Sequence, residues 1–247
     1  MRPSFAIDAL PESAALYRDT HAIVVVDVFR ATTVIVTALS RGHRIFPVAT
    51  IPEAQSVASH LNDPVLAGEQ AGIKPESFDL NNSPAAIAAL EGSRPVVLLS
   101  SAGTQLLAQA RGAGAIYVAC MRNVRATAEH LAANHNRVAL IGAGTKGEPR
   151  PEDQMVCGWM GRRLLEAGFA VENERTLAEV ECWRAARPEA VLASPSVDYL
   201  RRTSQDEDID FVLGHVDDVD AIAVFNGQQV SLLTTSELNT ALSMEAT

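Results

Sequence analysis

The chain has 247 residues and a formal net charge of −10, and 47% of its residues are hydrophobic. This composition is typical of a globular protein that buries a large core, and it excludes an intrinsically disordered chain. The acidic balance argues against nucleic acid as a partner, because binding to a phosphate backbone normally needs a basic surface.

The sequence gives no sign of export, membrane insertion or a thiolate metal site. The apolar run at residues 22–26 is far too short to span a bilayer, and residues 1–13 lack the basic and apolar regions of a signal peptide. The three cysteines form no C-x-x-C pair and the six histidines show no H-E-x-x-H spacing. We therefore expect a cytoplasmic protein without a membrane partner, in which any metal is held by oxygen ligands.

Apolar, strand-like runs alternate with segments of helical period over roughly the first 170 residues, a pattern that predicts a largely parallel α/β sheet. The predicted strands cover residues 22–28, 44–48, 65–68, 95–100, 115–119 and 137–142. The predicted helices begin near Ala31, Pro52, Pro84, Gly103, Val124 and Glu152.

After Gly168 the sequence favours helices, at residues 177–193 and 197–203, followed by an acidic stretch at 206–210. Two short apolar runs, 221–225 and 229–233, are separated by Asn226-Gly227, which is typical of a hairpin turn. We expect a single α/β domain over residues 1–247, a three-layer α/β/α fold with a largely parallel or mixed sheet, a helical C-terminal segment and a terminal hairpin. A division into two intertwined lobes stays open.

Polar residues follow the first predicted strand, at the edge of an α/β sheet where ligands bind. Segment 27–33 reads Asp-Val-Phe-Arg-Ala-Thr-Thr. A carboxylate (Asp27), a cation (Arg30) and the N–H groups of a helix start can together hold a metal and a phosphate. The alternative is that Asp27 caps the helix and forms an ion pair with Arg30.

Two later turns add further candidates. Glu69 follows an apolar strand and a glycine, so it should face the same crevice as Asp27, and such a pair of carboxylates predicts a magnesium site. Segment 100–104, Ser-Ser-Ala-Gly-Thr, offers hydroxyls and a glycine that suit an anion, although close packing alone also produces such turns. Ser83, which precedes a proline, is better explained as a helix N-cap.

Residues 142–147 match G-x-G-x-x-G, the dinucleotide-binding pattern. That pattern requires a helix that opens inside the glycine run, whereas Pro149 and Pro151 would interrupt its first turns. We therefore reject a nucleotide-dependent oxidoreductase and predict a flexible loop that carries Thr145 and Lys146 over the crevice. A solvated surface charge is the alternative for Lys146.

Taken together, these turns resemble the 2-phosphosulfolactate phosphatase (ComB) family over almost the whole chain. The resemblance implies a magnesium-dependent hydrolase associated with coenzyme M biosynthesis. The segments that carry it are 25–33, Gly68-Glu69, Phe78-Asp79 with Asn82-Ser83-Pro84, Ser101 with Gly103-Thr104, and 143–147 with Glu152-Asp153.

The polar turns predict a site for Mg²⁺ and a phosphate, and the resemblance implies hydrolysis of a small anionic phosphate monoester, 2-phosphosulfolactate, to sulfolactate and phosphate, with Mg²⁺ as cofactor. The expected catalytic residues are Asp27, Arg30 and Thr145; the expected metal ligands are Asp27, Glu69 and Asp153; the expected substrate-binding residues are Thr32, Thr33, Ser101, Gly103, Thr104 and Lys146. Whether water attacks directly or Asp27 first accepts the phosphoryl group stays open, as does a homodimer.

The chain departs from the family pattern at two positions. The family usually has Gly-Glu-Arg where this chain has Gln70 as the third residue, and Thr-Asn-Gly-Thr where it has Ala102 as the second. The two changes remove a cation and an amide that would bind an anion. A non-catalytic metabolite-binding homologue, or a phosphatase for a related phosphorylated hydroxy acid, therefore remains an alternative.

Overall fold

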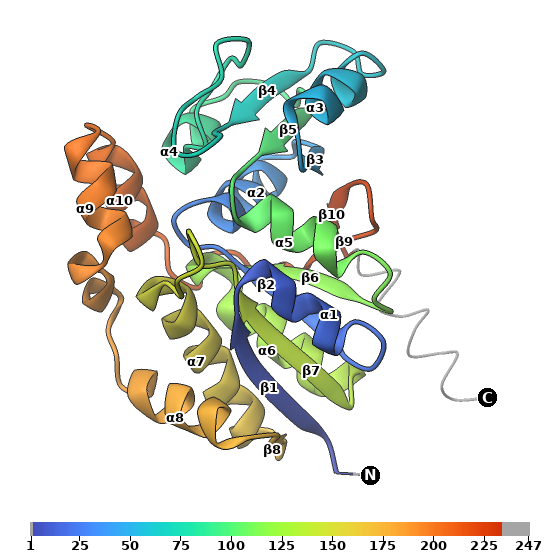
Figure 1. The fold of residues 1–247 in the computed structure, drawn as a ribbon, viewed down its shortest axis with the longest axis vertical. Coiled ribbons are helices and arrows are strands. Elements are labelled where there is room, and N and C mark those ends of the chain that lie inside the picture. Colours follow the sequence, from blue (N-terminus) through green and yellow to red (C-terminus); the bar gives the residue numbers. More distant parts are fainter. Residues whose placement is uncertain (1, 234–247) are drawn as a thin grey trace.

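A computed structural model describes residues 2–233 as an α/β protein built on one mixed sheet. Its ten strands have the order β4-β5-β3-β10-β9-β6-β2-β7-β1-β8 (Figure 1). The strands are β1 Ser4–Ala9, β2 Ala22–Val26, β3 Ile45–Val48, β4 Val65–Gly68, β5 Val96–Leu99, β6 Ile116–Ala119, β7 Arg137–Gly142, β8 Ala170–Val171, β9 Ala223–Phe225 and β10 Val230–Leu232. None of the helices in the described residues is long and apolar enough to cross a membrane.

The sheet consists of two parallel halves joined by the C-terminal hairpin. Strands β4, β5 and β3 are parallel in one half, and β6, β2, β7, β1 and β8 are parallel in the other. Between them, β10 pairs antiparallel with β3 and with β9, and β9 pairs antiparallel with β6. Three successive antiparallel pairings mean that β3 and β6 run in opposite directions. The two halves occupy the upper and lower parts of Figure 1.

Helices cover both faces of the sheet because successive strand residues point to opposite sides. In β2, Ile23 and Val25 belong to the core under α2 and α5, whereas Val24 and Val26 belong to the core under α6 and α7. The arrangement is therefore three-layered, as predicted. The helices are α1 Ala14–Tyr17, α2 Ala31–Ser40, α3 Ile51–Ala58, α4 Pro84–Ala88, α5 Gly103–Ala110, α6 Val124–Asn134, α7 Pro151–Glu166, α8 Glu174–Trp183, α9 Pro195–Arg202 and α10 Asp206–Gly214, with short 3-10 helices at Pro11–Ser13, Met121–Asn123 and Pro188–Ala193.

Helices α9 and α10, the last two within residues 2–233, form a small unit at one side of the molecule (orange in Figure 1). They pack on each other through the buried side chains of Val197, Leu200 and Ile209. Helix α9 begins at Pro195 because the Ser194 side chain accepts a hydrogen bond from the Val197 N–H. Helix α10 also contacts α4, so this unit lies against the half of the sheet that contains β4 and β5.

The predicted strands and helix starts agree with the structure to within two residues. Strands β1 and β8 were not predicted, because Asp8 interrupts the apolar run of β1 and β8 has only two residues. The predicted helix at 177–193 is broken, since α8 ends at Trp183 and a 3-10 helix begins at Pro188. The hairpin is confirmed, but its tip lies one residue later than predicted: the Asn226 N–H donates to the Gln229 carbonyl oxygen, which leaves Gly227 first in the turn, with a φ of 97°.

Candidate active site

The turn between β2 and α2 fixes Asp27 through two threonines of the helix. The Thr32 hydroxyl accepts a hydrogen bond from the Asp27 N–H (2.9 Å) and donates one to the Asp27 carbonyl oxygen (2.8 Å). The Thr33 hydroxyl donates to the Val28 carbonyl oxygen (2.8 Å). Both hydroxyls, which were predicted to bind substrate, are thus engaged by the backbone of the turn. Their effect in this structure is to hold the buried Asp27 carboxyl in place.

Glu69 lies near Asp27, although the two follow strands in opposite halves of the sheet. Its carboxylate accepts hydrogen bonds from the Ser101 N–H (2.6 Å), the Ser101 hydroxyl (2.8 Å) and the Gly72 N–H (2.6 Å). Burial and the negative charge of Glu69 raise the pKa of Asp27 from 3.8 to about 7. The structure therefore brings these two predicted ligands together, and it places Ser101 on Glu69.

Helix α5 begins against the Asp27 carboxyl. A Cβ atom on Gly103 would lie 2.5 Å from Asp27 Oδ2 and 2.7 Å from the Ala31 Cβ atom, so only glycine permits this approach. The Thr104 hydroxyl accepts from the Ser100 N–H (2.9 Å) and donates to the Ser100 carbonyl oxygen (2.8 Å). Of the predicted anion-binding residues in this turn, Gly103 thus borders Asp27 and Thr104 secures the backbone.

Two acidic residues at the start of α7 complete the cluster. The Asp153 carboxylate accepts hydrogen bonds from the N–H groups of Val28 (2.9 Å) and Gly144 (3.1 Å). It thereby links the turn between β2 and α2 to the glycine-rich loop after β7. Burial, Asp27 and Glu152 together raise the pKa of Asp153 well above its usual range. Glu152 was not among the predicted site residues, yet it is 1% exposed and its Oε2 atom has no hydrogen-bond partner within the described residues.

The glycine loop after β7 is a closed turn. Backbone hydrogen bonds join the Thr145 N–H to the Glu148 carbonyl oxygen (2.9 Å) and the Glu148 N–H to the Thr145 carbonyl oxygen (3.1 Å). Lys146 (φ 54°) and Gly147 (φ 77°) form its tip, where Lys146 is exposed, and the Thr145 hydroxyl donates to the Gly144 carbonyl oxygen. Helix α7 begins at Pro151, beyond the glycine run. A dinucleotide-binding site would need a helix that begins inside this run, so the structure agrees with the rejection of such a site.

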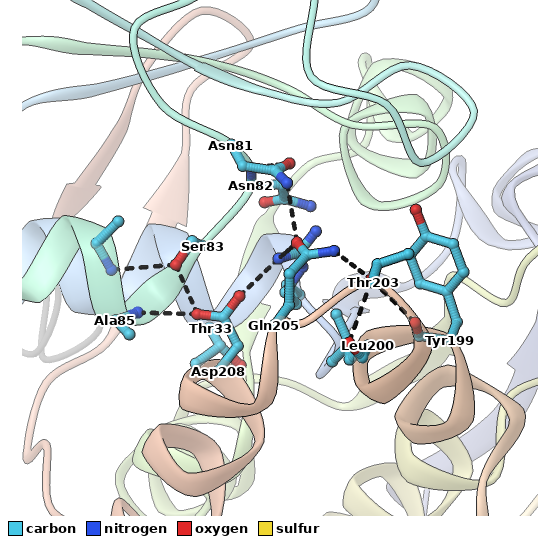
Figure 2. Close-up of polar contacts among 12 residues, drawn as sticks. Thr33, Asn81, Asn82, Ser83, Ala85, Tyr199, Leu200, Thr203, Gln205 and Asp208 are labelled. Atoms are coloured by element: carbon cyan, nitrogen blue, oxygen red, sulfur yellow. Dashed lines mark hydrogen bonds and ion pairs between the residues drawn. The ribbon is translucent and has the colours of Figure 1, made fainter.

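Arg30 is held by α10 and the residue before it. Its Nη1 atom donates to Asp208 Oδ2 (2.6 Å) and to Gln205 Oε1 (2.6 Å), and the Arg30 and Asp208 side chains are both almost fully buried. Figure 2 shows Asp208 reaching from α10 toward Ser83, and Gln205 reaching toward Asn81. Within the described residues Arg30 pairs with Asp208 and not with Asp27, so the alternative Asp27 ion pair is wrong.

The acidic cluster is suited to a divalent cation that also binds the substrate. Within residues 2–233, no three His, Cys, Asp or Glu side chains are arranged to hold a metal by themselves. Mg²⁺, however, commonly uses one or two carboxylates and completes its shell with water and substrate phosphate oxygens. Asp27 and Glu69 fit this role, because the repulsion that raises the pKa of Asp27 would be relieved by a cation between them.

Comparison with known proteins identifies the family. A family model described as 2-phosphosulpholactate phosphatase matches residues 8–228. The chain belongs to this family. Membership confirms the resemblance seen in the sequence and places the chain among phosphoric monoester hydrolases.

Individual relatives agree with this assignment, and each is named a probable 2-phosphosulfolactate phosphatase. The relative from Carboxydothermus hydrogenoformans is 34% identical over 70% of this chain and 73% of its own length. The one from Synechococcus sp. is 32% identical over 77% of this chain and 82% of its own. The one from Pseudothermotoga lettingae is 37% identical over 60% and 63%, respectively.

Proposed function

We propose that this phosphatase hydrolyses 2-phosphosulfolactate to sulfolactate and phosphate, that it requires Mg²⁺, and that it acts in the cytoplasm. The observation that carries the proposal is the buried Asp27 carboxyl, which lies close enough to Glu69 for its pKa to rise to about 7. Such a pair is costly unless a cation binds between the carboxylates or one of them keeps a proton. The names of the relatives support the choice of substrate.

In this proposal, Asp27 and Glu69 hold the metal, with Asp153 as a further candidate ligand. When bound, Mg²⁺ would neutralise charge on the transferring phosphoryl group and on the attacking oxygen. Thr32 and Thr33 orient Asp27 through the turn, and Ser101 orients Glu69. These contacts preorganise the two carboxylates before a ligand arrives.

The substrate carries a phosphate, a carboxylate and a sulfonate, and it must enter a protein with a formal charge of −10. Local positive groups are therefore required. Arg30, in the same turn as Asp27, offers a guanidinium that is held by Asp208, and Lys146 offers an ammonium at the tip of the exposed loop. We assign Arg30 to the phosphate and Lys146 to the anionic remainder of the substrate.

Two routes to phosphate release are open to this site. Either a water molecule attacks the phosphorus directly, or Asp27 first accepts the phosphoryl group and water then cleaves the acyl phosphate. A brief incubation with phosphorus-labelled substrate, followed by acid quench, separates them. A protein-bound label that hydroxylamine removes supports the route through Asp27, whereas an unlabelled protein during active turnover supports direct attack.

The proposal is tested by measuring inorganic phosphate released from a panel of phosphate monoesters, with Mg²⁺ or with EDTA. We expect 2-phosphosulfolactate or a related phosphorylated hydroxy acid to be turned over only with the metal. Tight binding of these compounds without release of phosphate would instead identify a non-catalytic homologue. No affinity for NAD(P) is expected.

A further inference from the structure

The helical unit α9–α10 reaches two separate parts of the candidate active site. From α9, the Tyr199 hydroxyl donates a hydrogen bond to the Gly72 carbonyl oxygen (2.7 Å), and the Gly72 N–H donates to Glu69. From α10, Asp208 binds Arg30. This unit therefore contacts the cation predicted to bind phosphate directly, and it reaches the carboxylate predicted to bind metal through Gly72.

Asp208 links three groups with its two oxygen atoms. Oδ2 accepts from Arg30 Nη1 (2.6 Å), while Oδ1 accepts from the Ser83 hydroxyl (2.6 Å) and the Ala85 N–H (3.2 Å). Figure 2 shows Asp208 between Ser83 and Ala85 at the start of α4, with Gln205 beside it. The Asp208 side chain is 3% exposed, so water cannot replace these partners at little cost.

This arrangement leaves one edge of Arg30 available. Nη1 carries two hydrogens and has two acceptors, Asp208 and Gln205. Within the described residues, the Nε and Nη2 atoms of Arg30 make no hydrogen bond. A guanidinium binds phosphate through two parallel N–H groups, and an arginine fixed at one Nη atom presents the other edge without further loss of conformational freedom.

We propose that Asp208 is a positioning residue that fixes Arg30 so that its Nε–Nη2 edge faces the phosphate group of the substrate. Gln205 assists by occupying the second N–H of Nη1. This inference rests on the proposed function for the identity of the reaction, but its core is a claim about phosphate binding. It makes α10 part of the active site, although Asp208 lies 178 positions after Arg30 in the chain.

Electrostatics and positioning predict opposite effects when Asp208 loses its charge. By Coulomb's law alone, removing a carboxylate next to Arg30 should strengthen binding of an anion. If Asp208 positions Arg30, the freed side chain should bind phosphate less well despite the more favourable charge. A loss of phosphate affinity is therefore a specific sign of positioning.

The experiment measures the dissociation constant of inorganic phosphate with Mg²⁺ by calorimetry, for the wild type, D208A, D208N, R30A, the double variant R30A/D208A and T50A. The control T50A removes the side chain that caps α3, which accepts a hydrogen bond from the Glu53 N–H, and it should lower stability while leaving phosphate affinity unchanged. Catalytic constants are measured in parallel wherever turnover is observed.

We expect D208A and R30A each to weaken phosphate binding by about ten- to a hundredfold. R30A removes the charge-assisted hydrogen bonds between Arg30 and phosphate, and D208A leaves Arg30 without the partner that positions it for them. In the R30A background, D208A should cause no further loss of phosphate affinity, because it acts through Arg30, and the removed negative charge can only favour the anion. D208N should give a smaller loss, of about threefold or more, since an asparagine can serve Arg30 only by presenting its NH₂ group to the Ala85 N–H.

The outcomes decide the proposal even if the proposed reaction is wrong. Should the wild type release phosphate from no monoester, the binding data still test Arg30 and Asp208. Should D208A fail to fold, D208N decides alone. Unchanged or tighter phosphate binding in the folded Asp208 variants, or an additive effect in the double variant, would overturn the proposal, as would a wild type that does not bind phosphate.

Discussion

Replacing Asp27 by asparagine should abolish magnesium-dependent activity and at the same time stabilise the metal-free protein. The side chains are nearly isosteric, so the hydrogen bonds that shape the turn can persist, but the charge that attracts the metal is lost. The stabilisation follows from the pKa of Asp27, which burial and Glu69 raise from 3.8 to about 7. The metal-free protein pays a free-energy penalty whenever this buried carboxyl is ionised.

The size and pH dependence of this penalty follow from linkage. The unfolded chain releases the Asp27 proton near its ordinary pKa of 3.8, whereas the folded chain keeps it up to about 7. Between these values the folded state binds the extra proton, so the stability of the metal-free wild type falls as pH rises. Each pKa unit corresponds to about 1.4 kcal/mol. The rise in the pKa of Asp27 from 3.8 to about 7 therefore gives a penalty of about 4 kcal/mol at about pH 8, where this carboxyl is ionised in the folded protein as well.

Urea unfolding in EDTA measures this quantity directly. The D27N variant should be more stable than the wild type by up to about 4 kcal/mol at about pH 8, and by less than half of that at about pH 5. D19N, at a side chain that is 87% exposed, is the matched control and should show no such change. The reasoning is refuted if D27N is no more stable than the wild type, or if its advantage does not depend on pH.

Three further predictions concern the same site. Mg²⁺ should raise the melting temperature of the wild type more at about pH 8 than at about pH 5, because the metal competes with the Asp27 proton; equal shifts at both values would contradict metal binding at Asp27. G103A should lower stability by about 1–3 kcal/mol and impair turnover, since its Cβ would displace the Asp27 carboxyl, whereas G114A, where a Cβ meets nothing within 4 Å, should behave as the wild type in a phosphate-release assay. Q70R should improve kcat/KM for 2-phosphosulfolactate by about one to two powers of ten, because Gln70 is exposed beside Glu69 where the family has an arginine; an efficient wild type with no gain in Q70R would place Gln70 outside the anion site.

The sequence was sufficient to locate the acidic centre of the site. Asp27 and Glu69 each follow a short apolar strand. A strand that is buried on both faces is recognisable in the sequence as a continuous run of apolar residues. The expected reason for their proximity was a shared parallel edge. In the structure the two strands belong to halves that run in opposite directions, and only the hairpin between β6 and β3 produces this arrangement.

Other features depend on contacts that local patterns do not record. The hydroxyls of Thr32, Thr33 and Thr104 suit an anion by type, but the tight turns around them use these groups as backbone partners. Asp208 lies in an acidic helix start that is typical of a solvated surface, and its burial results from an ion pair with a residue 178 positions away. Glu152 was recognised only as part of a family motif, because the burial of its Oε2 atom without a hydrogen-bond partner among the described residues is a property of the packed structure.

The central claim, that the Asp27–Glu69 pair supports metal-dependent phosphate release, is tested most directly by one assay. Inorganic phosphate is measured after incubation of 2-phosphosulfolactate with the wild type and with D27N, each with Mg²⁺ and with EDTA. We predict release by the wild type with Mg²⁺ alone and none by D27N under either condition. Release that persists in EDTA, or that survives the loss of the Asp27 charge, would contradict the account.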